Sequence, residues 1–517
     1  MVKSLDHVKV HSSVSDTIAR VCLAVTALFI LSNCAYTPST EHQTYSHSLS
    51  PNPESRIARS LQFEKFSYAR ALLIEAPDFA LRSRVDLINA ADTTIDVQYF
   101  IWQNDASGIF VIEKLLQAAD RGVRIRALLD DIQLKGLVSK LNVLDEHPNI
   151  EIRIFNPFSM RIHFPLELFR VAEFAIDGNR LNHRMHNKLF VADNQLAILG
   201  GRNIGDDYFG YSKKRHFIDT DILLSGDIVN KLSKGFDSYW NSRWAFPVSE
   251  IAHAHLRKDN LEMLRERINK RLANYPQLIT LSNESSFKYT MDRLGKAYVL
   301  SEAETVIDDP SVRWPDRPDE IAAELTKVAM NVQKEVLIVS PYLVPTPNTF
   351  DIAKVLQARG VRIKVVTNSL ATNDSVIAHS AYARYRKAIL ASGVELYEMR
   401  ADPEFTGKII SEQNSLHSKY IIFDDEVVFI GSMNLDRRSL YLNTELGVVL
   451  RSRGLADALR DSFRTLILPE NSWRVTNTEN GLRWTSSAGI VDKEPAKSDM
   501  HRIKSQLLRM IPVSNQL

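Results

Sequence analysis

The chain has 517 residues, 44% of them hydrophobic and 24% charged, which is a composition typical of globular proteins. That length exceeds what one hydrophobic core accommodates, so at least two domains are expected. The formal net charge is only +2, so no strongly basic field indicates nucleic-acid binding; a local basic patch is the alternative, and no nucleic-acid partner is expected.

The N-terminal region predicts an exported, lipid-anchored protein. An apolar run at 21–31 is too short to span a bilayer comfortably and suits the core of a signal peptide. The sequence LSNC then resembles a bacterial lipoprotein cleavage site, with Cys34 as the lipidated residue. We therefore expect a signal segment at 1–34, a flexible tether at 35–55, and a membrane-associated lipoprotein of the cell envelope on the periplasmic side. An uncleaved segment, with the protein peripheral on the cytoplasmic membrane, is the alternative.

The remaining sequence contains an internal repeat in which strand patterns alternate with helical patterns. RGVRI occurs at 121–125 and again at 359–363. The predicted elements of the first copy are strands at 93–102, 124–131, 151–157, 188–193 and 195–201 and a helix at 110–120. Those of the second copy are strands at 334–345, 362–369, 394–399, 419–425 and 427–432 and a helix at 351–358. This alternation predicts an α/β sheet with some parallel order in each half.

The repeat sets the expected domain organisation of the chain. The predicted segments are a first half-domain at 56–250, a connector at 251–315, a second half-domain at 316–470 and a C-terminal tail at 471–517, which is a candidate for membrane contact.

Each copy contains a histidine, a lysine and an aspartate in the pattern H-x-K-x4-D, namely His186, Lys188 and Asp193, then His417, Lys419 and Asp424. Side chains two apart on a strand share a face, so each histidine points the same way as its lysine. A lysine repels a metal ion but attracts a phosphate, and the imidazole supplies a nucleophile or a proton. The pattern therefore predicts catalysis on a phosphate group, with no metal or other cofactor.

The residues that follow each motif are suited to phosphate contact. Gly201 permits close approach of the backbone, and Asn203, Ser432 and Asn434 offer neutral hydrogen-bond donors. We count the two motif aspartates among the catalytic candidates, with orientation of a local loop as their alternative role.

A single histidine on a strand is more often a satisfied core residue than a catalytic one. Here, however, five positions recur at identical spacing in matching repeat context, which chance does not explain, and both copies are complete. Two halves that face each other supply two histidines to one phosphorus atom. One imidazole then attacks while the other protonates the leaving oxygen.

The paired motif resembles the signature of the phospholipase D superfamily. Longer stretches are similar to those of bacterial cardiolipin synthases of the C type, including DVQYFIWQND, RMHNKLFVAD, GGRNIGDDYFG and IGSMNLDRRSLYLNTELG. The resemblance covers nearly the whole chain after residue 56. It implies an α/β fold of two pseudo-symmetric α/β/α sandwich half-domains, with mixed, largely parallel sheets and the active site at their interface. It also implies phosphodiester exchange through a phosphohistidine.

The resemblance assigns roles to the matched residues. His186 corresponds to the nucleophile and His417 to the general acid, then base; superfamily precedent alone sets that order. The phosphate-binding residues of the family correspond to Lys188, Lys419, Asn203 and Asn434. In the family a carboxylate after each motif orients a histidine, usually that of the opposite half. Glu445 and Asp221 are the expected pair, and Asp219 is the rival of Asp221.

The leading hypothesis is a phosphatidyltransferase that makes cardiolipin, in which the glycerol hydroxyl of a second phospholipid removes the phosphatidyl group from His186. A hydrolytic phospholipase D and a phosphodiesterase or nuclease are the enzymatic alternatives, and a non-catalytic lipid-binding protein is the alternative from another class. The expected partners are phospholipids (phosphatidylglycerol, with phosphatidylethanolamine as a second candidate) and a membrane surface, and the expected state is a monomer.

Two further segments combine apolar and basic residues. The stretch at 157–170, PFSMRIHFPLELFR, predicts either an interfacial loop that grips acyl chains or a core helix. The stretch at 501–513 predicts either a helix that lies on anionic lipid or an ordinary packing helix.

Overall fold

The computed structural model describes residues 44–61, 69–134, 136–158, 173–174, 177–251, 260–282, 285–299, 302–312, 320–406 and 411–510. The chain divides into two compact units, Met1–Glu41 with Phe158–Leu181, and His42–Pro157 with Asn182–Leu517. The second unit contains both motif copies. The predicted signal segment with Cys34, and most of the predicted interfacial stretch at 157–170, lie outside the described residues.

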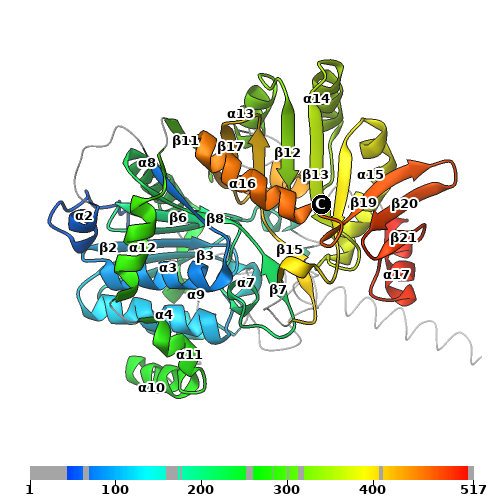
Figure 1. Cartoon of the computed structure of the whole chain (residues 1–517). Helices are drawn as coiled ribbons and strands as arrows, with labels where there is room; N and C mark the ends of the chain where they lie inside the picture. Colours follow the sequence, from blue (N-terminus) through cyan, green and yellow to red (C-terminus); the bar gives the residue numbers. More distant parts are fainter. Residues whose placement is uncertain are drawn as a thin grey trace, which may run out of the picture. The chain divides into compact units, whose positions relative to one another are not determined.

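The first half-domain is built on a nine-stranded mixed sheet (Figure 1). In spatial order its strands are β10 (Tyr298–Val299), β1 (Arg70–Ile74), β8 (Asp221–Ser225), β6 (Leu196–Gly200), β5 (Lys188–Ala192), β2 (Thr94–Tyr99), β3 (Arg124–Asp130), β4 (Ile150–Phe155) and β9 (Ala245–Pro247). The parallel pairs are β2 with β3 and β3 with β4.

The second half-domain is built on a ten-stranded sheet. In spatial order its strands are β11 (Glu302–Ile307), β18 (Leu446–Arg451), β17 (Val427–Gly431), β16 (Tyr420–Phe423), β12 (Glu335–Val339), β13 (Arg362–Asn368), β14 (Glu395–Met399), β19 (Ser472–Thr478), β20 (Gly481–Ser486) and β21 (Gly489–Val491). From β11 to β19 this order matches that from β1 to β9 in the first sheet, strand for strand. The expected pseudo-symmetric pair of α/β half-domains is therefore confirmed.

The sheets are mixed, as expected, but parallel pairing is confined to the three-strand groups β2–β3–β4 and β12–β13–β14. The motif strands belong instead to antiparallel hairpins, β5 with β6 and β16 with β17. Asp193 and Asn194, with φ of 51° and 53°, form the first hairpin turn, and Asp424, with φ of 50°, lies at the equivalent place in the second. Two consecutive positive φ angles are typical of the tight type I′ turn that joins antiparallel strands.

Helices cover both faces of each sheet, as labelled in Figure 1. The α-helices of the first half-domain and connector are α2 (Arg56–Ser60), α3 (Pro77–Ala90), α4 (Ala106–Asp120), α5 (Val138–Leu144), α7 (Asp206–Phe209), α8 (Asp227–Trp240), α9 (Val248–Ile251), α10 (Leu261–Leu272), α11 (Pro276–Ile279) and α12 (Ser285–Gly295). Those of the second half-domain are α13 (Glu320–Ala329), α14 (Pro347–Ala358), α15 (Val376–Ala391), α16 (Arg453–Leu466) and α17 (Asp499–Arg509).

The two half-domains share one hydrophobic core. Alternate residues of each strand point to opposite faces, so Phe190 packs toward α3 and α4, whereas Leu189 and Val191 pack toward α8. The core beside α8 also contains Leu337 and Val339 of the second sheet, together with apolar residues of α16. A separate core lies between the second sheet and helices α13, α14 and α15. The inner faces of the two sheets are therefore joined through α8 and α16.

Both ends of the described chain are more integrated than the sequence predicts. The described part of the expected tether is held on the first half-domain, where Ser48 binds Asp237 and Arg126 donates to the carbonyl of Ser46. The expected C-terminal tail contributes β19, β20 and β21 to the second sheet, and α17 packs on α15. In the sequence these two segments resemble a tether and a tail, because the residues that bind them lie far away along the chain.

Candidate active site

The two motifs meet because each begins with a backbone contact to the other half. The amide of His186 donates to the carbonyl of Thr444 at 2.9 Å, and the amide of His417 donates to the carbonyl of Ile218 at 2.7 Å. The second contact continues a two-stranded parallel sheet made by β7 (His216–Ile218) and β15 (Asn414–Leu416), one strand from each half (Figure 1). The two motifs therefore meet where the two halves contact each other.

His186 is paired with a carboxylate from the opposite half. Its Nδ1 lies 2.8 Å and 3.0 Å from the two carboxylate oxygens of Glu445, and both side chains are buried. Glu445 is itself fixed by the Ser432 hydroxyl, which donates to its Oε2, and its own amide donates to Asp308. An Nδ1–H that donates to this carboxylate leaves Nε2 of a neutral imidazole as the free nucleophilic atom.

His417 has the mirror-image arrangement, with a different carboxylate from the one we favoured. Its Nδ1 lies 2.6 Å from Oδ2 of Asp219. Asp221 instead forms a fully buried ion pair with Arg84 at 2.9 Å and accepts from the amide of Arg202. The choice of Asp221 is therefore wrong, and Asp219 is the orienting carboxylate, because two buried arginines already occupy the region around Asp221.

Burial sets the charge states of the histidines. Burial lowers the pKa of His186 to about 4, against the raising effect of Glu445. Burial also lowers the pKa of His417 well below its ordinary value, helped by Lys419 and Lys188 and, more weakly, by His186 itself. Although burial alone raises the pKa of Glu445, His186 and the neighbouring donors lower it to about 2. The site therefore holds His186 as the neutral imidazole beside an ionised Glu445.

The motif lysines lie in the same buried space. The Lys188 ammonium donates to the carbonyl of His186 and lies 5.2 Å from the ring centre of Phe100. The Lys419 ammonium donates to the carbonyl of His417 and lies 2.9 Å from its Nδ1. Burial lowers the pKa of Lys188 well below its ordinary value and that of Lys419 to about 8. Two desolvated ammonium groups make a strong binding site for a phosphodiester anion.

The motif aspartates lie at the far ends of their strands and touch no histidine. Asp193 accepts from the amides of Asp92, Thr93 and Thr94, and Asp424 accepts from three successive amides, those of Gln333, Lys334 and Glu335. These contacts favour their alternative role, the orientation of a local loop. A strand advances about 3.3 Å per residue, so the spacing in H-x-K-x4-D carries the aspartate well away from the histidine. Each motif aspartate stabilises the turn of its hairpin instead.

The predicted phosphate ligands divide into three groups. The Ser432 hydroxyl is committed to Glu445, and a Cβ at Gly201 would lie 2.1 Å from Asp219 Oδ1, so both serve the orienting carboxylates instead. The side-chain amide of Asn203 donates through Nδ2 to the hydroxyl of Tyr208 at 2.8 Å. Asn434 is buried, and neither atom of its side-chain amide has a hydrogen-bond partner among the described residues, so its Nδ2–H groups are free to donate to a phosphate oxygen. Asn434 is therefore the best placed of these residues to meet a ligand.

Aromatic rings line the histidines, which motif spacing does not reveal. Phe100 packs edge-on to His186, with ring centres 4.8 Å apart. Tyr208 and Phe217 stack on each other and pack against His417 at 5.3 Å and 4.9 Å. The available signals were the aromatic ending of DVQYF and the YF pair of GGRNIGDDYFG. These rings keep water away from the imidazoles, whose side chains are less than a tenth exposed.

Two negative observations concern only the described ranges. No group of three or more histidine, cysteine, aspartate or glutamate side chains within them is arranged to hold a metal ion. None of the helices in those ranges is both long enough and apolar enough to span a membrane.

Comparison with known proteins agrees with the geometry. The family model described as "Cardiolipin synthase, PLD-like domain" matches residues 85–240 and 325–467, and each stretch contains one motif. Cardiolipin synthase C of Escherichia coli (strain K12) is 34% identical over 451 residues, which cover 84% of this chain and 93% of the relative. Cardiolipin synthase 1 of Staphylococcus aureus (strain COL) is 26% identical over 378 residues, covering 73% of this chain and 63% of the relative.

A solved structure supports the fold. The crystal structure of phosphatidylserine synthase from Haemophilus influenzae Rd KW20 superposes with a TM-score of 0.58 at 13% identity, covering 89% of this chain and 100% of the other. The two-sheet architecture, the facing motifs and the sequence matches lead to one conclusion: the chain belongs to the cardiolipin synthase family of phospholipase D-like enzymes.

Proposed function

We propose that the protein makes cardiolipin by transferring a phosphatidyl group between phospholipids. The observation that carries the proposal is the pair of buried histidines, each oriented by a carboxylate of the opposite half and each next to a buried lysine. This arrangement supplies a nucleophile, a second proton-transfer group and an anion site around one position.

The proposed reaction has two balanced steps. Nε2 of His186 attacks the phosphorus of a phosphatidylglycerol, and the bond to the glycerol oxygen breaks. His417, which must enter this step as the imidazolium, gives its Nε2 proton to the departing glycerol and becomes neutral. His417 can then accept the proton of a glycerol hydroxyl on a second phosphatidylglycerol. That oxygen attacks phosphorus, the phosphorus–nitrogen bond breaks, and cardiolipin forms. Phosphatidylethanolamine is the second candidate donor, because its diester differs only in the leaving alcohol.

The proposal favours transfer to lipid over transfer to water. Both steps expose a reactive phosphorus to whatever hydroxyl enters, and the aromatic rings around the histidines restrict water. The test is to incubate the purified protein with phosphatidylglycerol vesicles and to identify the products by mass spectrometry. Cardiolipin together with free glycerol supports the proposal. Phosphatidic acid without cardiolipin makes the protein a hydrolase instead.

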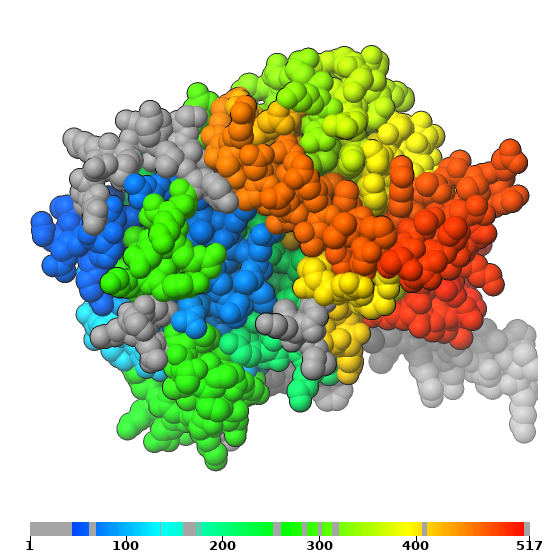
Figure 2. All heavy atoms as spheres, viewed as in Figure 1, coloured from blue at the N-terminus to red at the C-terminus, as the bar shows by residue number. Residues whose placement is uncertain are grey.

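We also propose that α17 lies on the membrane surface. Its inward side is polar: Ser505 is fully buried against Ser380, and Arg502 and Arg509 bind Glu494. Its outward side is apolar, with Met500, Ile503, Leu507 and Met510 exposed by 47–81% at helical spacing. A helix held by polar contacts, with an apolar stripe facing outward beside exposed Lys504, fits an anionic lipid surface. The C-terminal residues form one part of the visible surface in Figure 2.

Vesicle sedimentation tests this surface. The double variant Ile503→Glu with Leu507→Glu is expected to lose tenfold or more of its binding to phosphatidylglycerol vesicles, since each apolar side chain contributes about 1.5–3 kcal/mol when buried. Gln506→Glu is the matched control, because it adds charge at an exposed position without removing apolar area. Both carry Cys34→Ser so that a lipid anchor does not contribute. Equal binding by the double variant and the control contradicts the proposal.

A further inference from the structure

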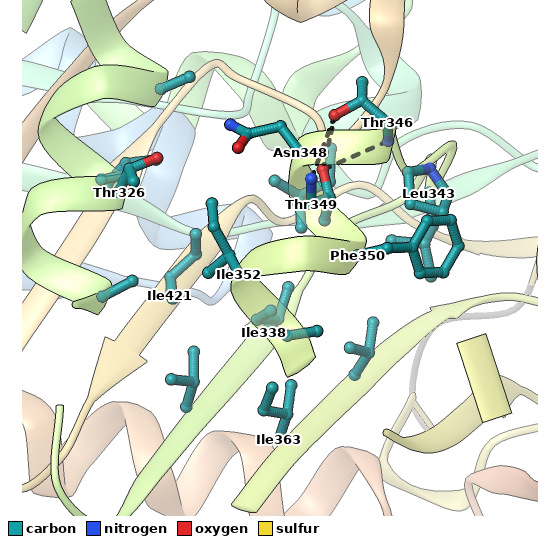
Figure 3. Close-up of a pocket in the computed structure, with 18 of the residues that line it drawn as sticks. Thr326, Ile338, Leu343, Thr346, Asn348, Thr349, Phe350, Ile352, Ile363 and Ile421 are labelled. Carbon is teal, nitrogen blue, oxygen red and sulfur yellow. Dashed lines mark hydrogen bonds between the residues drawn. The ribbon is translucent and has the colours of Figure 1, made fainter. Parts of the chain in front are cut away.

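The second half-domain contains an apolar cavity that the reaction chemistry does not use. It lies between α13, α14 and the sheet beneath them and has a volume of about 180 Å³. Figure 3 shows Ile338, Ile352, Ile363 and Ile421 around it, with Thr326, Asn348 and Thr349 at its upper side. No charged side chain lines it. An apolar cavity of about 150 Å³ already stays dry and binds a molecule the size of benzene, so this one suits a hydrocarbon ligand.

The two half-domains can be compared at the place that this cavity occupies in the second. At the matching place, between α4 and strands β3 and β4, lies a much smaller space of about 30 Å³. The difference comes from the helices. α4 buries most of its residues, and α10 of the connector packs on it. α14, by contrast, buries only Leu356, while Phe350, Ile352 and Ala353 remain partly exposed above the cavity.

One end of the cavity is formed by the loop that carries Asn434. Met433 and Leu435, on either side of Asn434, both line the cavity. Leu435 is fixed there because its carbonyl accepts from the amide of Val344 at 2.7 Å. Ser432, which precedes Met433 in the chain, donates to Glu445, and Glu445 in turn contacts His186. The apolar space therefore begins where the candidate phosphate-binding loop ends.

We propose that this cavity binds one acyl chain of a phospholipid substrate whose phosphate lies at Asn434. The inference rests on the proposed lipid-transfer function and adds to it a specific site for hydrocarbon. The lining matches an acyl chain and no ionic group, and the matching place in the first half-domain is much smaller, so one chain of one substrate is held this way. The chain enters at the end formed by Met433 and Leu435 and lies beneath α14.

A filling variant tests the site. Ala353→Phe places a ring into the cavity, and Val355→Phe, on the 42% exposed side of the same helix, is the matched control. Each methylene that is kept out of the cavity is expected to cost roughly fourfold in affinity. Ala353→Phe should therefore lower kcat/KM for dioleoyl phosphatidylglycerol by tenfold or more, while kcat/KM for soluble dihexanoyl phosphatidylglycerol changes less than twofold. Val355→Phe should affect neither substrate.

Photo-crosslinking of the unmodified protein gives an answer that does not depend on the folding of a variant. Phosphatidylglycerol with a diazirine along its acyl chain is expected to label peptides of α13 and α14 around the cavity. Labelling confined to other segments, or an equal effect of Ala353→Phe on both substrates, overturns the acyl-chain site and leaves the transfer function standing. If the unmodified protein transfers no phosphatidyl group from either substrate, the proposed function fails instead.

Discussion

Nδ1 of His417 lies 2.6 Å from Oδ2 of Asp219, although the two residues belong to different half-domains and are 198 positions apart in the chain. The relationship is reciprocal, because His186 in turn receives its carboxylate from Glu445. Each half thus contributes a histidine to the site and a carboxylate to the histidine of the other half. Neither half has a complete catalytic pair by itself.

Asp219→Asn is expected to lower kcat by roughly 10²–10⁴-fold without unfolding the protein. An amide in place of the carboxylate no longer fixes the tautomer of His417 or stabilises its protonated form. Asp221→Asn is the matched control. It breaks the buried pair with Arg84, which costs about 3–5 kcal/mol of folding free energy, but should leave kcat per folded molecule near that of the unmodified protein. Steady-state kinetics together with thermal unfolding separate the two effects, and the opposite assignment would be supported if Asp221→Asn alone lost turnover.

Replacing either histidine with alanine is expected to reduce turnover by several orders of magnitude, because each performs a step that the other does not. The two variants should differ in what they trap. With a substrate whose leaving group needs no proton, such as a nitrophenyl ester of phosphatidic acid, His417→Ala should still accumulate phosphatidyl-enzyme, whereas His186→Ala should not. Mass spectrometry of the intact protein measures this. Accumulation on His186→Ala instead would exchange the two roles.

The pH dependence of kcat/KM should be a bell. His186 attacks as the neutral imidazole, and burial lowers its pKa to about 4, so activity falls as the pH drops through about 4. His417 donates its proton as the imidazolium, and Lys188 and Lys419 bind phosphate as ammonium groups. Activity therefore falls as the pH rises through their lowered pKa values, of which that of Lys419 is about 8. Lys419→Arg should remove the part of the alkaline limb near pH 8, because a guanidinium stays protonated. An alkaline limb at the same pH in that variant would assign it to another group.

Cys34 is expected to carry lipid, and the mature chain is expected to begin there in the cell envelope. The apolar run at 21–31 followed by LSNC motivates this prediction. Intact-mass analysis of protein purified from membranes should give a chain that starts at Cys34 with added acyl mass. A mass that includes Met1, or an unmodified Cys34, contradicts it, and Cys34→Ser is the control that should lose the added mass.

Much of the candidate site can be predicted from the sequence, because the residues of each motif lie close together in the chain. The identical spacing of the two copies predicts that both motifs lie where the halves meet, and the NTE sequence contains Glu445, which the structure places 2.8 Å from His186. What the sequence misassigns depends on distant partners. Asp219 and Asp221 are two residues apart and equally plausible until Arg84 and Arg202 are placed beside the second.

The predicted strand directions and the predicted C-terminal tail differ from the structure because they too depend on backbone angles or distant partners. The strand patterns of the motif hairpins are correct in position, but strand direction depends on the turn, and only backbone angles such as those of Asp193 and Asn194 settle it. The residues after 471 resemble a tail because their sheet partner, β14, lies about seventy positions earlier. The apolar cavity beside α14 has no sequence signal at all, because the helix pattern there resembles that of the fully packed α4.

The crossed carboxylates have a consequence for biosynthesis. His186 and Glu445 are 259 positions apart, so the first motif leaves the ribosome long before its partner exists. A nascent or prematurely terminated chain that ends before Glu445 carries an unoriented His186 and a partial core. Such a chain has no complete pair of oriented histidines. The enzyme is therefore expected to be inactive during its own synthesis, and activity is expected only when nearly the whole polypeptide has been made and folded.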